Sequence, residues 1–311
     1  MEGDSDALYD PRNGDVALSV RDLELAAGEA EPPRTNRFAV YWIQEGSGQF
    51  QADGARHAFG PNSLLFFVPY QYVRLSPDRP VRGAVVEFHA NFLCIETYHA
   101  EIGCNGVLFN DPYGVPLVSL NEAAAGEAAD LIVRIRRELA EAGVAHAEVL
   151  LSYLKVLLVL ATRLKLRQGT GEAGARLLPP ELERLAELVE ANYRNLHSPA
   201  DYAALLYVTP KTLGRLVRKW LGKTPTDLIR DRILKHAKWQ LLHTLRPVKE
   251  IARELGYDDE LYFSRLFKRA TGCSPTFFRE FETEIRGGAN LSMPSTPPSI
   301  PPPPLGAEHS L

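Results

Sequence analysis

Cysteine is scarce in this chain of 311 residues, with only Cys94, Cys104 and Cys273 present. Three cysteines cannot form the paired framework of a small secreted domain, and their scarcity is typical of a protein kept in a reducing cytosol. The longest apolar run, at residues 149–161, is too short to span a membrane and contains polar residues. The first ten residues are acidic and do not resemble a signal peptide. We therefore expect a cytoplasmic protein without a membrane segment.

Positive charge is sparse in the N-terminal half and concentrated towards the C-terminus, although the whole chain has a net charge of −4. Residues 1–177 contain 16 basic and 23 acidic side chains, whereas residues 178–286 contain 19 and 15. Within the second region, residues 205–279 hold 16 basic and 7 acidic side chains. Charge alone does not distinguish a solvated helical surface from a binding surface. It does indicate that a polyanionic partner would bind the C-terminal region only.

The N-terminal half has the pattern of a β domain. Residues 1–35 are polar and weakly patterned, and we expect them to be loose. From Phe38 the chain contains short β-rich runs bounded by Pro, Gly, Asn or Asp: FAVYWI, QFQADGARHAF, LLFFVP, YQYVRL and VRGAVVEFH. Asp53 and Gly54 predict a hairpin turn within the second run. Short strands without intervening helices indicate an antiparallel barrel or sandwich over residues 36–120.

A helical period replaces the β pattern after Asn121. Residues 121–168 predict two helices, and the first helix places apolar residues, among them Leu131 and Ile135, on one face. These apolar faces exceed what a small barrel needs to cover. We therefore expect the two helices to mediate dimerisation, with Leu131 and Ile135 in the contact.

The rest of the chain is helical between two segments of simple composition. Residues 169–178 (GTGEAGARLL) are typical of a linker, and residues 179–286 predict a series of helices. Residues 287–311 are proline-rich and predict a disordered or polyproline II tail. The expected fold class is α+β and multidomain, with an N-terminal β-barrel plus helices and a C-terminal all-α domain.

Two stretches of the C-terminal region repeat each other at an offset of 50 residues. TLGRLVRKWLGKTPTDLI begins at Thr212, and the related stretch ELGYDDELYFSRLFKRATGCSPTFFR begins at Glu254. Both contain a short helix, a tight turn and an amphipathic helix when their flanks are included, and one long helix at Pro225–Leu242 joins them. The matched pairs are Arg215 with Arg265, Leu216 with Leu266, Arg218 with Lys268, Gly222 with Gly272, Thr224 with Ser274 and Pro225 with Pro275.

Local signals define the helices of each copy. In the first copy Ser198 predicts the start of the short helix, and Thr209 predicts the start of the amphipathic helix. In the second copy either Asp258 or Asp259 is the expected cap, and Gly256 suits a turn that needs a positive φ. The second turn is expected to be one residue longer than the first.

A short helix, a turn and an amphipathic helix form a helix-turn-helix unit, whose second helix enters the major groove of DNA. Arg215 and Arg265 lie mid-helix on the outer face, where a guanidinium can bond guanine bidentately. One such helix pair is common as simple packing, but two copies at constant spacing favour the reading of two groove segments about 34 Å apart. Basic residues that we expect to meet phosphates are Arg218, Lys219, Lys223, Lys268 and Arg269.

The second copy also resembles a known family signature. The pattern A-x3-G-[FY]-x5-F-x3-F-[KR]-x3-G-x-[ST]-P is matched at Ala252, Gly256, Tyr257, Phe263, Phe267, Lys268, Gly272, Ser274 and Pro275. This pattern is similar to the signature of the AraC-type family of bacterial transcription regulators. The resemblance covers about Leu182 to Arg279, and the β domain with its helices looks like the effector-binding and dimerisation half of that family.

The resemblance implies which residues read bases. The matching positions are Lys211, Thr212, Gly214 and Arg215 in the first copy, and Glu260, Leu261, Ser264 and Arg265 in the second. The first copy departs from the family pattern, because Val217 replaces the usual Phe and Gly214 has no side chain that could read a base. We expect base contacts in the first copy to shift to Lys211 and Arg215.

The β domain resembles a cupin-type sensor barrel. Its aromatic residues that could line an effector cavity are Tyr41, Trp42, Phe66, Tyr70 and Tyr72. Aromatic residues on strands more often form a core, so the two interpretations stay open. A metal-binding or enzymatic cupin needs several converging His and Glu ligands, and His57 lacks a His-x-His pair.

One segment holds ligand-type residues without a recognised metal motif: His89, Cys94, His99, Glu101 and Cys104. Their spacing matches no standard zinc finger, and both cysteines lie in apolar sequence, where burial is the usual role. The sequence shows no nucleophile–base pair and no phosphate-binding glycine loop. We therefore expect no metal, no cofactor and no catalytic residues.

The sequence favours a transcription regulator that binds a double-stranded DNA operator, with an N-terminal domain for effector sensing, dimerisation or both. Expected partners besides DNA are a second copy of the chain, RNA polymerase and an unidentified small-molecule effector. Two alternatives stay open. One is a cupin-type metal enzyme with an accessory helical domain, which metal analysis would reveal; the other is a DNA-binding module whose β domain serves only assembly.

Overall fold

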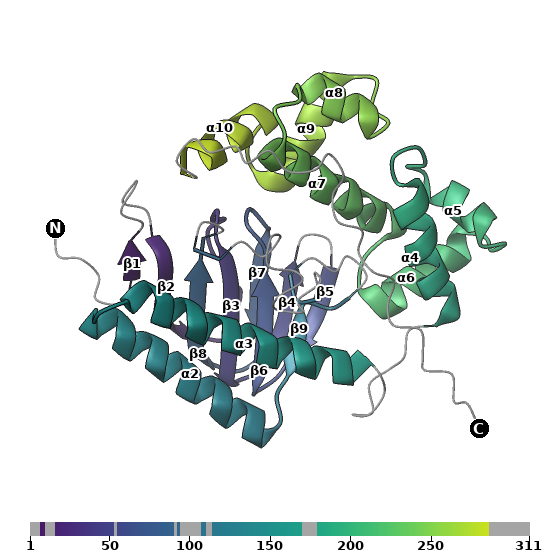
Figure 1. Ribbon diagram of the computed structural model, residues 1–311. Helices are drawn as coiled ribbons and strands as arrows, with labels where there is room; N and C mark the ends of the chain where they lie inside the picture. Colours follow the sequence, from purple (N-terminus) through teal and green to yellow (C-terminus); the bar gives the residue numbers. More distant parts are fainter. Residues whose placement is uncertain are drawn as a thin grey trace, which may run out of the picture. The chain divides into compact units, whose positions relative to one another are not determined.

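The computed structural model describes residues 7–9, 16–52, 55–89, 92–93, 107–109, 114–169 and 179–285 (Figure 1). The chain divides into two compact units, here named the N-terminal unit (Met1–Asp111 with Val115–Gly169) and the C-terminal unit (Thr170–Leu311 with Pro112–Gly114). The predicted hairpin turn at Asp53 and Gly54, nearly all of the predicted linker and the predicted tail lie outside the described residues. No helix in the described ranges is long and apolar enough to cross a membrane.

Two antiparallel sheets form the β part of the N-terminal unit. The larger sheet has the strand order β1-β2-β8-β3-β6-β9, and the smaller has the order β5-β4-β7. The strands are β1 (Ala7–Tyr9), β2 (Val16–Leu25), β3 (Phe38–Glu45), β4 (Gly48–Ala52), β5 (Ala55–Phe59), β6 (Ser63–Phe67), β7 (Val73–Pro77), β8 (Val81–Phe88) and β9 (Leu117–Ser119). The prediction of an antiparallel β unit is confirmed, and closure of the sheets into a barrel stays a prediction.

The larger sheet buries both of its faces because its central strands are apolar at successive positions. Val40 and Trp42 of β3 lie in a core with helices α2 (Glu122–Glu141) and α3 (His146–Gly169). Tyr41 and Ile43 lie in a second core with residues of the smaller sheet. Successive side chains of a strand point to opposite faces, so β3 serves both cores.

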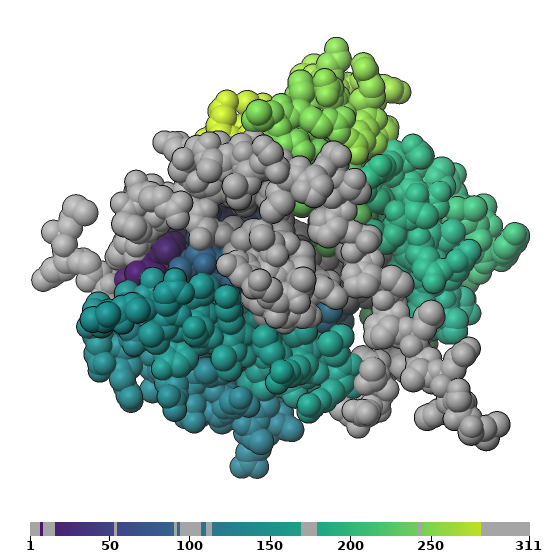
Figure 2. All heavy atoms as spheres, viewed as in Figure 1, coloured from purple at the N-terminus to yellow at the C-terminus, as the bar shows by residue number. Residues whose placement is uncertain are grey.

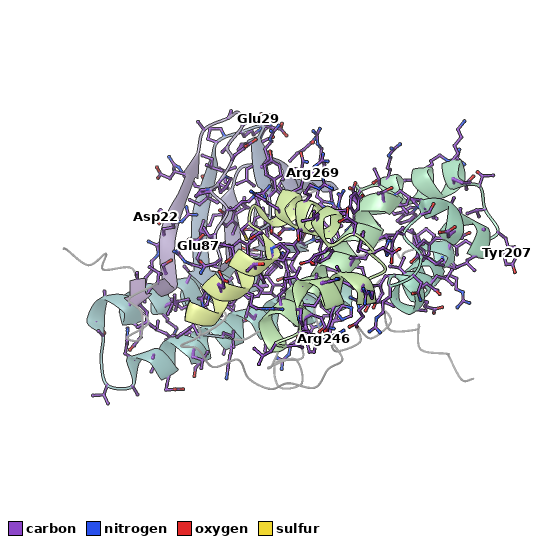
Figure 3. All side chains as sticks on the ribbon, turned by 90° about the horizontal axis from the view of Figure 1, so that it is seen from above. Asp22, Glu29, Glu87, Tyr207, Arg246 and Arg269 are labelled. Carbon is purple, nitrogen blue, oxygen red and sulfur yellow. The ribbon has the colours of Figure 1, made fainter. Side chains whose placement is uncertain are left out.

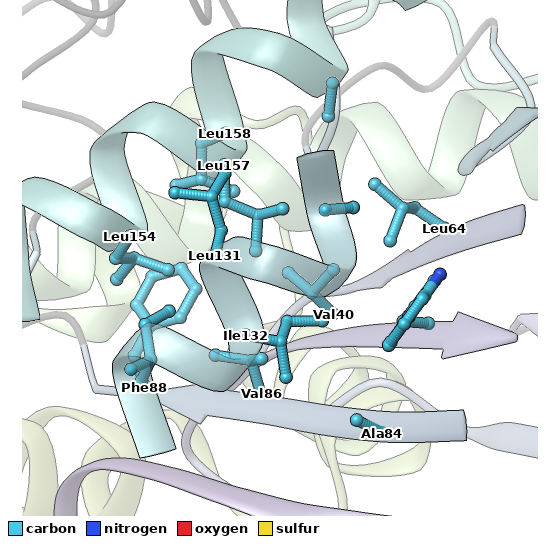
Figure 4. Close-up of a cluster of buried hydrophobic side chains, with 14 of the residues drawn as sticks. Val40, Leu64, Ala84, Val86, Phe88, Leu131, Ile132, Leu154, Leu157 and Leu158 are labelled. Atoms are coloured by element: carbon cyan, nitrogen blue, oxygen red, sulfur yellow. The ribbon is translucent and has the colours of Figure 1, made fainter. Parts of the chain in front are cut away.

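The helix-side core holds α2 and α3 against the sheet. Figure 4 shows this packing through Leu131 and Ile132 of α2, Leu154, Leu157 and Leu158 of α3, and Val40, Val86 and Phe88 of the sheet. Each fully buried leucine of this kind stabilises the unit by about 1.5–3 kcal/mol. The α3 helix is also tied to the sheet by Lys165 Nζ, which donates to the backbone oxygen of Leu117 at 2.8 Å.

The structure corrects two domain boundaries. Strand β2 lies within residues 1–35, which the sequence predicts to be loose, and it pairs with β8 from Leu18–Phe88 to Leu25–Val81. Its charged residues weaken the alternation, and its stability comes from pairing with a strand far along the chain. The helices of residues 121–168 are not a separate region either, because they share one core with the sheet.

Seven helices make up the described part of the C-terminal unit. They are α4 (Pro180–Asn192), α5 (Pro199–Leu205), α6 (Pro210–Leu221), α7 (Pro225–His243), α8 (Val248–Glu254), α9 (Glu260–Thr271) and α10 (Pro275–Ile285). The pairs α5–α6 and α8–α9 are the two predicted helix-turn-helix units, and they lie on either side of α7 (Figure 1). A reciprocal cap between Thr224 and Asp227 starts α7 where the sequence predicts it.

Candidate nucleic-acid interface

The first helix-turn-helix unit consists of α5, a tight turn and α6. At the start of α5, Ser198 Oγ accepts a hydrogen bond from Ala200 N at 3.2 Å. At the start of α6, Thr209 Oγ1 accepts one from Thr212 N at 3.1 Å, and Gly222 ends the helix with a φ of 67°. Both predicted caps are confirmed. Each cap pairs an amide that the helix leaves unbonded, which stabilises the helix by about 1 kcal/mol.

The second unit consists of α8, a turn and α9. Asp259 Oδ1 accepts a hydrogen bond from Leu261 N at 2.8 Å, so Asp259 rather than Asp258 is the cap of α9. Gly256 has a φ of 79°, which confirms the expected positive φ in this turn. A Cβ atom at Gly256 would lie 2.3 Å from the backbone oxygen of Arg194, so the position accepts only glycine without rearrangement.

The two turns differ in length by one residue. In the first turn Val208 N donates to Ala203 O, and in the second turn Tyr257 N donates to Ala252 O, both at 2.9 Å. The offset between the copies is 49 residues at these positions and 50 residues at the two arginines. The extra residue therefore lies in the second turn, as the sequence predicts.

Tyr207 fills the position in the first turn that glycine fills in the second. It has a φ of 57° and its side chain is 97% exposed. Figure 3 shows Tyr207 at the outer end of the α5–α6 pair, pointing away from the helices. A left-handed backbone costs a non-glycine residue about 1–2 kcal/mol, so this turn is strained where the second turn is not.

The inner faces of α6 and α9 fix these helices on the unit. Leu213 and Val217 of α6, and Phe263 and Phe267 of α9, are completely buried. Three further apolar residues of these helices are only half-buried: Leu216, Trp220 and Leu266. Because the inner faces are buried, each helix presents one defined outer face.

The outer faces carry the predicted base-reading residues. Lys211 and Arg215 are exposed on α6, the side chain of Arg265 is 75% exposed on α9, and Leu261 is 73% exposed. The other predicted base-reading residues are half-buried: Thr212, Glu260 and Ser264. The hydroxyl of Thr212 lies 2.9 Å from that of Thr209, so it belongs to the cap of α6. The structure thus brings one exposed arginine to the middle of each outer face.

The basic residues around these faces are mostly available to a polyanion. Among the described residues, Arg215, Lys268 and Arg269 have no hydrogen-bond or ion-pair partner, and all three are exposed. Arg265 Nη2 lies 3.8 Å from Asp259 Oδ2 in an exposed pair. Solvent screening makes such a pair weak, so a DNA base could displace Asp259 at little cost.

Lys223 is not available to a phosphate. Its side chain is buried, and Nζ donates to Asp231 Oδ2 at 3.2 Å. The sequence predicts a phosphate contact here because Lys223 follows the end of α6. The prediction is wrong because α7 folds back and places Asp231, eight residues further on, against the ammonium group.

A family model described as a helix-turn-helix domain matches residues 202–280, which run from α5 into α10. The arabinose operon regulatory protein of Salmonella typhimurium is 39% identical over 80 residues, which are 26% of this chain and 28% of that protein. Its counterpart in Escherichia coli is 37% identical over 92 residues, or 30% of each chain. The match to the family model lies within the C-terminal unit and agrees with the resemblance of that unit to the AraC-type family. The chain matches less than a third of the length of either relative.

Solved structures are similar to a part of this chain or to most of it. The C-terminal domain of AraT, a response regulator from Geobacillus stearothermophilus, is 32% identical with a TM-score of 0.33. This match covers 33% of this chain and 87% of the AraT chain. ToxT from Vibrio cholerae is 13% identical with a TM-score of 0.37, and the match covers 85% of this chain and 98% of the ToxT chain.

The aromatic residues predicted for an effector cavity in the N-terminal unit do not share one surface. Trp42 and Phe66 lie in the helix-side core, whereas Tyr41 lies in the core between the sheets. Tyr70 is buried between β6 and β7 with a φ of 62°, and Tyr72 belongs to neither core. These five side chains therefore do not line one common cavity. Neighbouring residues of a strand, such as Tyr41 and Trp42, must face opposite sides.

Sequence reasoning missed a charged cluster beside Tyr41. Glu87 of β8 is only 8% exposed, and it lies 3.6 Å from Arg21 and 3.7 Å from Arg37. Arg21 Nη2 also donates to Tyr41 Oη at 3.4 Å, and burial raises the pKa of Tyr41. The acidic residue within the apolar run VRGAVVEFH was the signal that could have revealed this cluster.

The segment that holds ligand-type residues is only partly described. His89 is buried, whereas Cys94, His99, Glu101 and Cys104 lie outside the described residues. His57 of β5 packs beside the ring of Phe50, with a centroid distance of 5.3 Å. In the part of the chain that the structure describes, no group of three His, Cys, Asp or Glu side chains could hold a metal ion.

The dimer contact expected at Leu131 and Ile135 is also corrected. Both side chains are buried in the helix-side core, since the apolar face of α2 covers the sheet. The exposed apolar residues on the outer sides of these helices are Val133, Val156 and Leu166, with exposed fractions of 53%, 47% and 41%. The outer sides of α2 and α3 form part of the surface seen in Figure 2.

Proposed function

We propose that the chain is a sequence-specific transcription regulator whose two helix-turn-helix units bind successive major-groove segments of one DNA operator. The observation that carries this proposal is the pair of helices α6 and α9, with Arg215 and Arg265 at matching places on their outer faces. Both helices belong to one compact unit, and α7 connects their units. One exposed arginine suits many helical surfaces, but two on matched helices suit a bipartite DNA site.

Each exposed group has a role in this proposal. Arg215 and Arg265 donate to O6 and N7 of guanine, while the exposed Leu261 suits the methyl group of thymine. Lys211 reaches a base or a phosphate at the start of α6. The cations proposed to bind phosphates are Arg218, Lys219, Lys268 and Arg269.

The N-terminal unit supplies regulation in this proposal. The cluster of Glu87, Arg21, Arg37 and Tyr41 offers hydrogen-bonding groups to a polar effector at one side of a β core. The outer sides of α2 and α3 offer an apolar surface to a second copy of the chain. RNA polymerase is the further partner that such a regulator needs, and the cytoplasm is its proposed place of action.

Selection of binding sites from random DNA with the full-length protein, followed by footprinting, tests the DNA-binding proposal. We expect two protected groove segments about 34 Å apart on one face of the DNA. Protection of a single segment would contradict the proposal.

Salt dependence tests the phosphate contacts. Lys268→Ala should lower the slope of log affinity against log salt by about one, because one fewer counterion is released. Lys223→Ala is the matched control, since the buried Lys223 contacts no phosphate and its loss should leave the slope unchanged.

Sedimentation tests the proposed dimer. Val133→Glu combined with Val156→Glu should shift the protein to monomers without unfolding it, because both side chains are exposed. Arg134→Glu on the same helix is a control that adds negative charge outside the apolar surface. A wild type that is monomeric at all concentrations contradicts this part.

A further inference from the structure

A buried polar cluster joins the second helix-turn-helix unit to α4 and α7 inside the C-terminal unit. Its centre is His236 of α7, which is completely buried. His236 Nδ1 lies 2.8 Å from Tyr193 Oη at the end of α4, and its Nε2 lies 3.1 Å from Gln240 Nε2 on the next turn of α7. Gln240 Nε2 also donates to the carboxylate of Glu254, the last residue of α8, at 3.1 Å. The cluster thus joins α4, α7 and α8.

The chemistry of these groups fixes the direction of each hydrogen bond. The carboxylate of Glu254 only accepts, so the amide nitrogen of Gln240 must face it. The same nitrogen faces His236 Nε2, which therefore accepts, and the ring proton lies on Nδ1 and is donated to Tyr193 Oη. Burial lowers the pKa of His236 to about 4, so the neutral ring that this arrangement needs is present near neutral pH.

Arginines from three segments hold the outer members of the cluster. Arg246, which precedes α8, binds the carboxylate of Glu254. Arg194, in the loop between α4 and α5, lies 3.8 Å from Glu254 and donates to Tyr193 Oη at 3.3 Å. Arg232 of α7 lies over the ring of Tyr193, 4.0 Å from its centroid. Every member of the cluster is therefore paired, which a buried polar group requires.

The turn of the second unit also rests on the loop that leads into the first unit. The backbone oxygen of Arg194 occupies the space beside Gly256 where a side chain would begin. The ring of Tyr257 stacks on His197, with a centroid distance of 4.7 Å and an interplanar angle of 27°. The second unit is thus held by directed contacts to residues 193–197, in addition to its covalent connection through α7.

We propose that the cluster of Tyr193, His236, Gln240 and Glu254, here named the polar joint, sets the angle and distance between α6 and α9. It thereby makes the protein select operators by the spacing between their two segments. This inference rests on the proposed function. Residues 244–247 between α7 and α8 are not helical, so the α7 helix does not continue into α8 and does not by itself fix the direction of α8. Hydrogen bonds restrict direction, whereas apolar groups of similar volume stabilise a core without doing so.

The test measures the affinity of the full-length protein for a selected operator. It compares this affinity with that for operators in which the spacing between the two segments is one or two base pairs longer or shorter. Two variants break the polar joint: Glu254→Gln removes its charge, and His236→Leu with Gln240→Leu makes its centre apolar. Glu250→Gln is the matched control. Glu250 lies one turn earlier on α8 and also faces Arg246, at 3.5 Å, but its side chain is 56% exposed.

The wild type should bind its own spacing much more tightly than the altered spacings. In both variants that break the polar joint, we expect the ratio of the affinities for the selected and the altered spacings to fall about tenfold. The contacts of the polar joint form one coupled network, so breaking part of it weakens the whole. Affinity for a single segment and the helical circular dichroism should stay unchanged, and Glu250→Gln should keep the wild-type preference. If Glu254→Gln fails to fold, the double variant His236→Leu with Gln240→Leu still tests the proposal, because the double variant leaves no unpaired charge.

The outcomes separate the two proposals. If the wild type protects one segment only, or binds all spacings equally, the proposed function fails and this inference fails with it. If the wild type strongly prefers one spacing and the folded variants of the polar joint keep that preference, the proposed role of the polar joint is overturned. The proposed function then stands.

Discussion

The two helix-turn-helix units have matching outer faces but different supports. In the first unit the turn is open to solvent, and Tyr207 is exposed there in a left-handed conformation. In the second unit the equivalent turn packs on one side against residues 193–197, since Gly256 lies against Arg194 and Tyr257 stacks on His197. The repeat therefore preserves the recognition surface and not the way in which each copy is attached.

The start of the short helix shows the same difference. Ser198 caps α5 with its side chain, whereas α8 begins after Pro247 without a side-chain cap. The α8 helix is anchored instead at its last residue, Glu254, which binds Arg246 and Gln240. The first unit is stabilised by local contacts and the second by contacts distant in sequence.

The largest expected effect is at Gly256. Gly256→Ala should lower the free energy of unfolding of the C-terminal unit by about 3–5 kcal/mol, because the added methyl group meets the backbone oxygen of Arg194 at a strained φ. Gly214→Ala on α6 is the control, since a Cβ there meets nothing within 4 Å. It should raise stability by about 0.5–1 kcal/mol. Urea unfolding measures both, and a loss below about 1 kcal/mol at Gly256 would mean that the second turn does not pack tightly against Arg194.

The polar joint should make the stability of the C-terminal unit depend on pH. The pKa of His236 is about 4 in the folded chain because of burial, against 6.5 for an ordinary histidine. The unfolded chain therefore binds a proton that the folded chain does not. The stabilisation is fully present above pH 6.5 and is lost as the pH falls from 6.5 to 4, by about 3 kcal/mol in total. The charged and titratable groups that face the ring are Tyr193, Arg194, Arg232, Arg246 and Glu254.

Carboxylates also titrate in this pH window. The measured quantity is therefore the difference in stability loss between the wild type and a variant without His236. The free energy of unfolding is followed from pH 7 to pH 4 for the wild type and for His236→Leu with Gln240→Leu. The wild type should lose more stability than the double variant. Parallel curves would show that His236 does not remain neutral in the folded protein.

The outer arginines should have similar effects on DNA binding in both units. Arg215→Ala and Arg265→Ala should each weaken specific binding by about 1–3 kcal/mol and relax the preference at one base pair. The two affected base pairs should lie in different operator segments. Binding to operators with single base-pair changes measures this. A variant that keeps wild-type affinity and preference would show that its unit reads no base through that arginine.

The smallest expected effect is at Tyr207. Tyr207→Asn should raise the free energy of unfolding by about 0.5–1 kcal/mol, because asparagine tolerates the left-handed conformation better. DNA affinity should not change, since the open turn makes no proposed DNA contact. Thermal unfolding and binding to the operator measure the two quantities. A loss of affinity would mean that the exposed ring of Tyr207 contacts DNA or a second protein.

Sequence reasoning succeeded where the structure depends on short-range rules. The caps at Ser198 and Thr209, the positive φ at Gly256 and the extent of α7 follow from residues within a few positions of one another. It failed at Lys223, because the burial of that residue depends on the packing of α7. It also did not find the polar joint, since Tyr193 and His236 are distant in sequence and neither forms a motif.

Two other errors in the N-terminal unit differ in kind. Strand β2 was missed because its stability comes from pairing with β8, and a single strand with Arg21, Asp22 and Glu24 has a weak pattern. The proposed cavity, in contrast, contradicted the sequence itself, because the alternation of strand side chains already separates Tyr41 from Trp42.

The core shared by the larger sheet and α2–α3 has a consequence for how such proteins are assembled in evolution. A recombination breakpoint between the sheet and the helices would leave the apolar faces of both exposed, and the products would aggregate. A breakpoint near Gly169 would separate the two compact units without cutting either core. Sheet and helices should therefore be inherited together, while the C-terminal unit is free to be exchanged between genes.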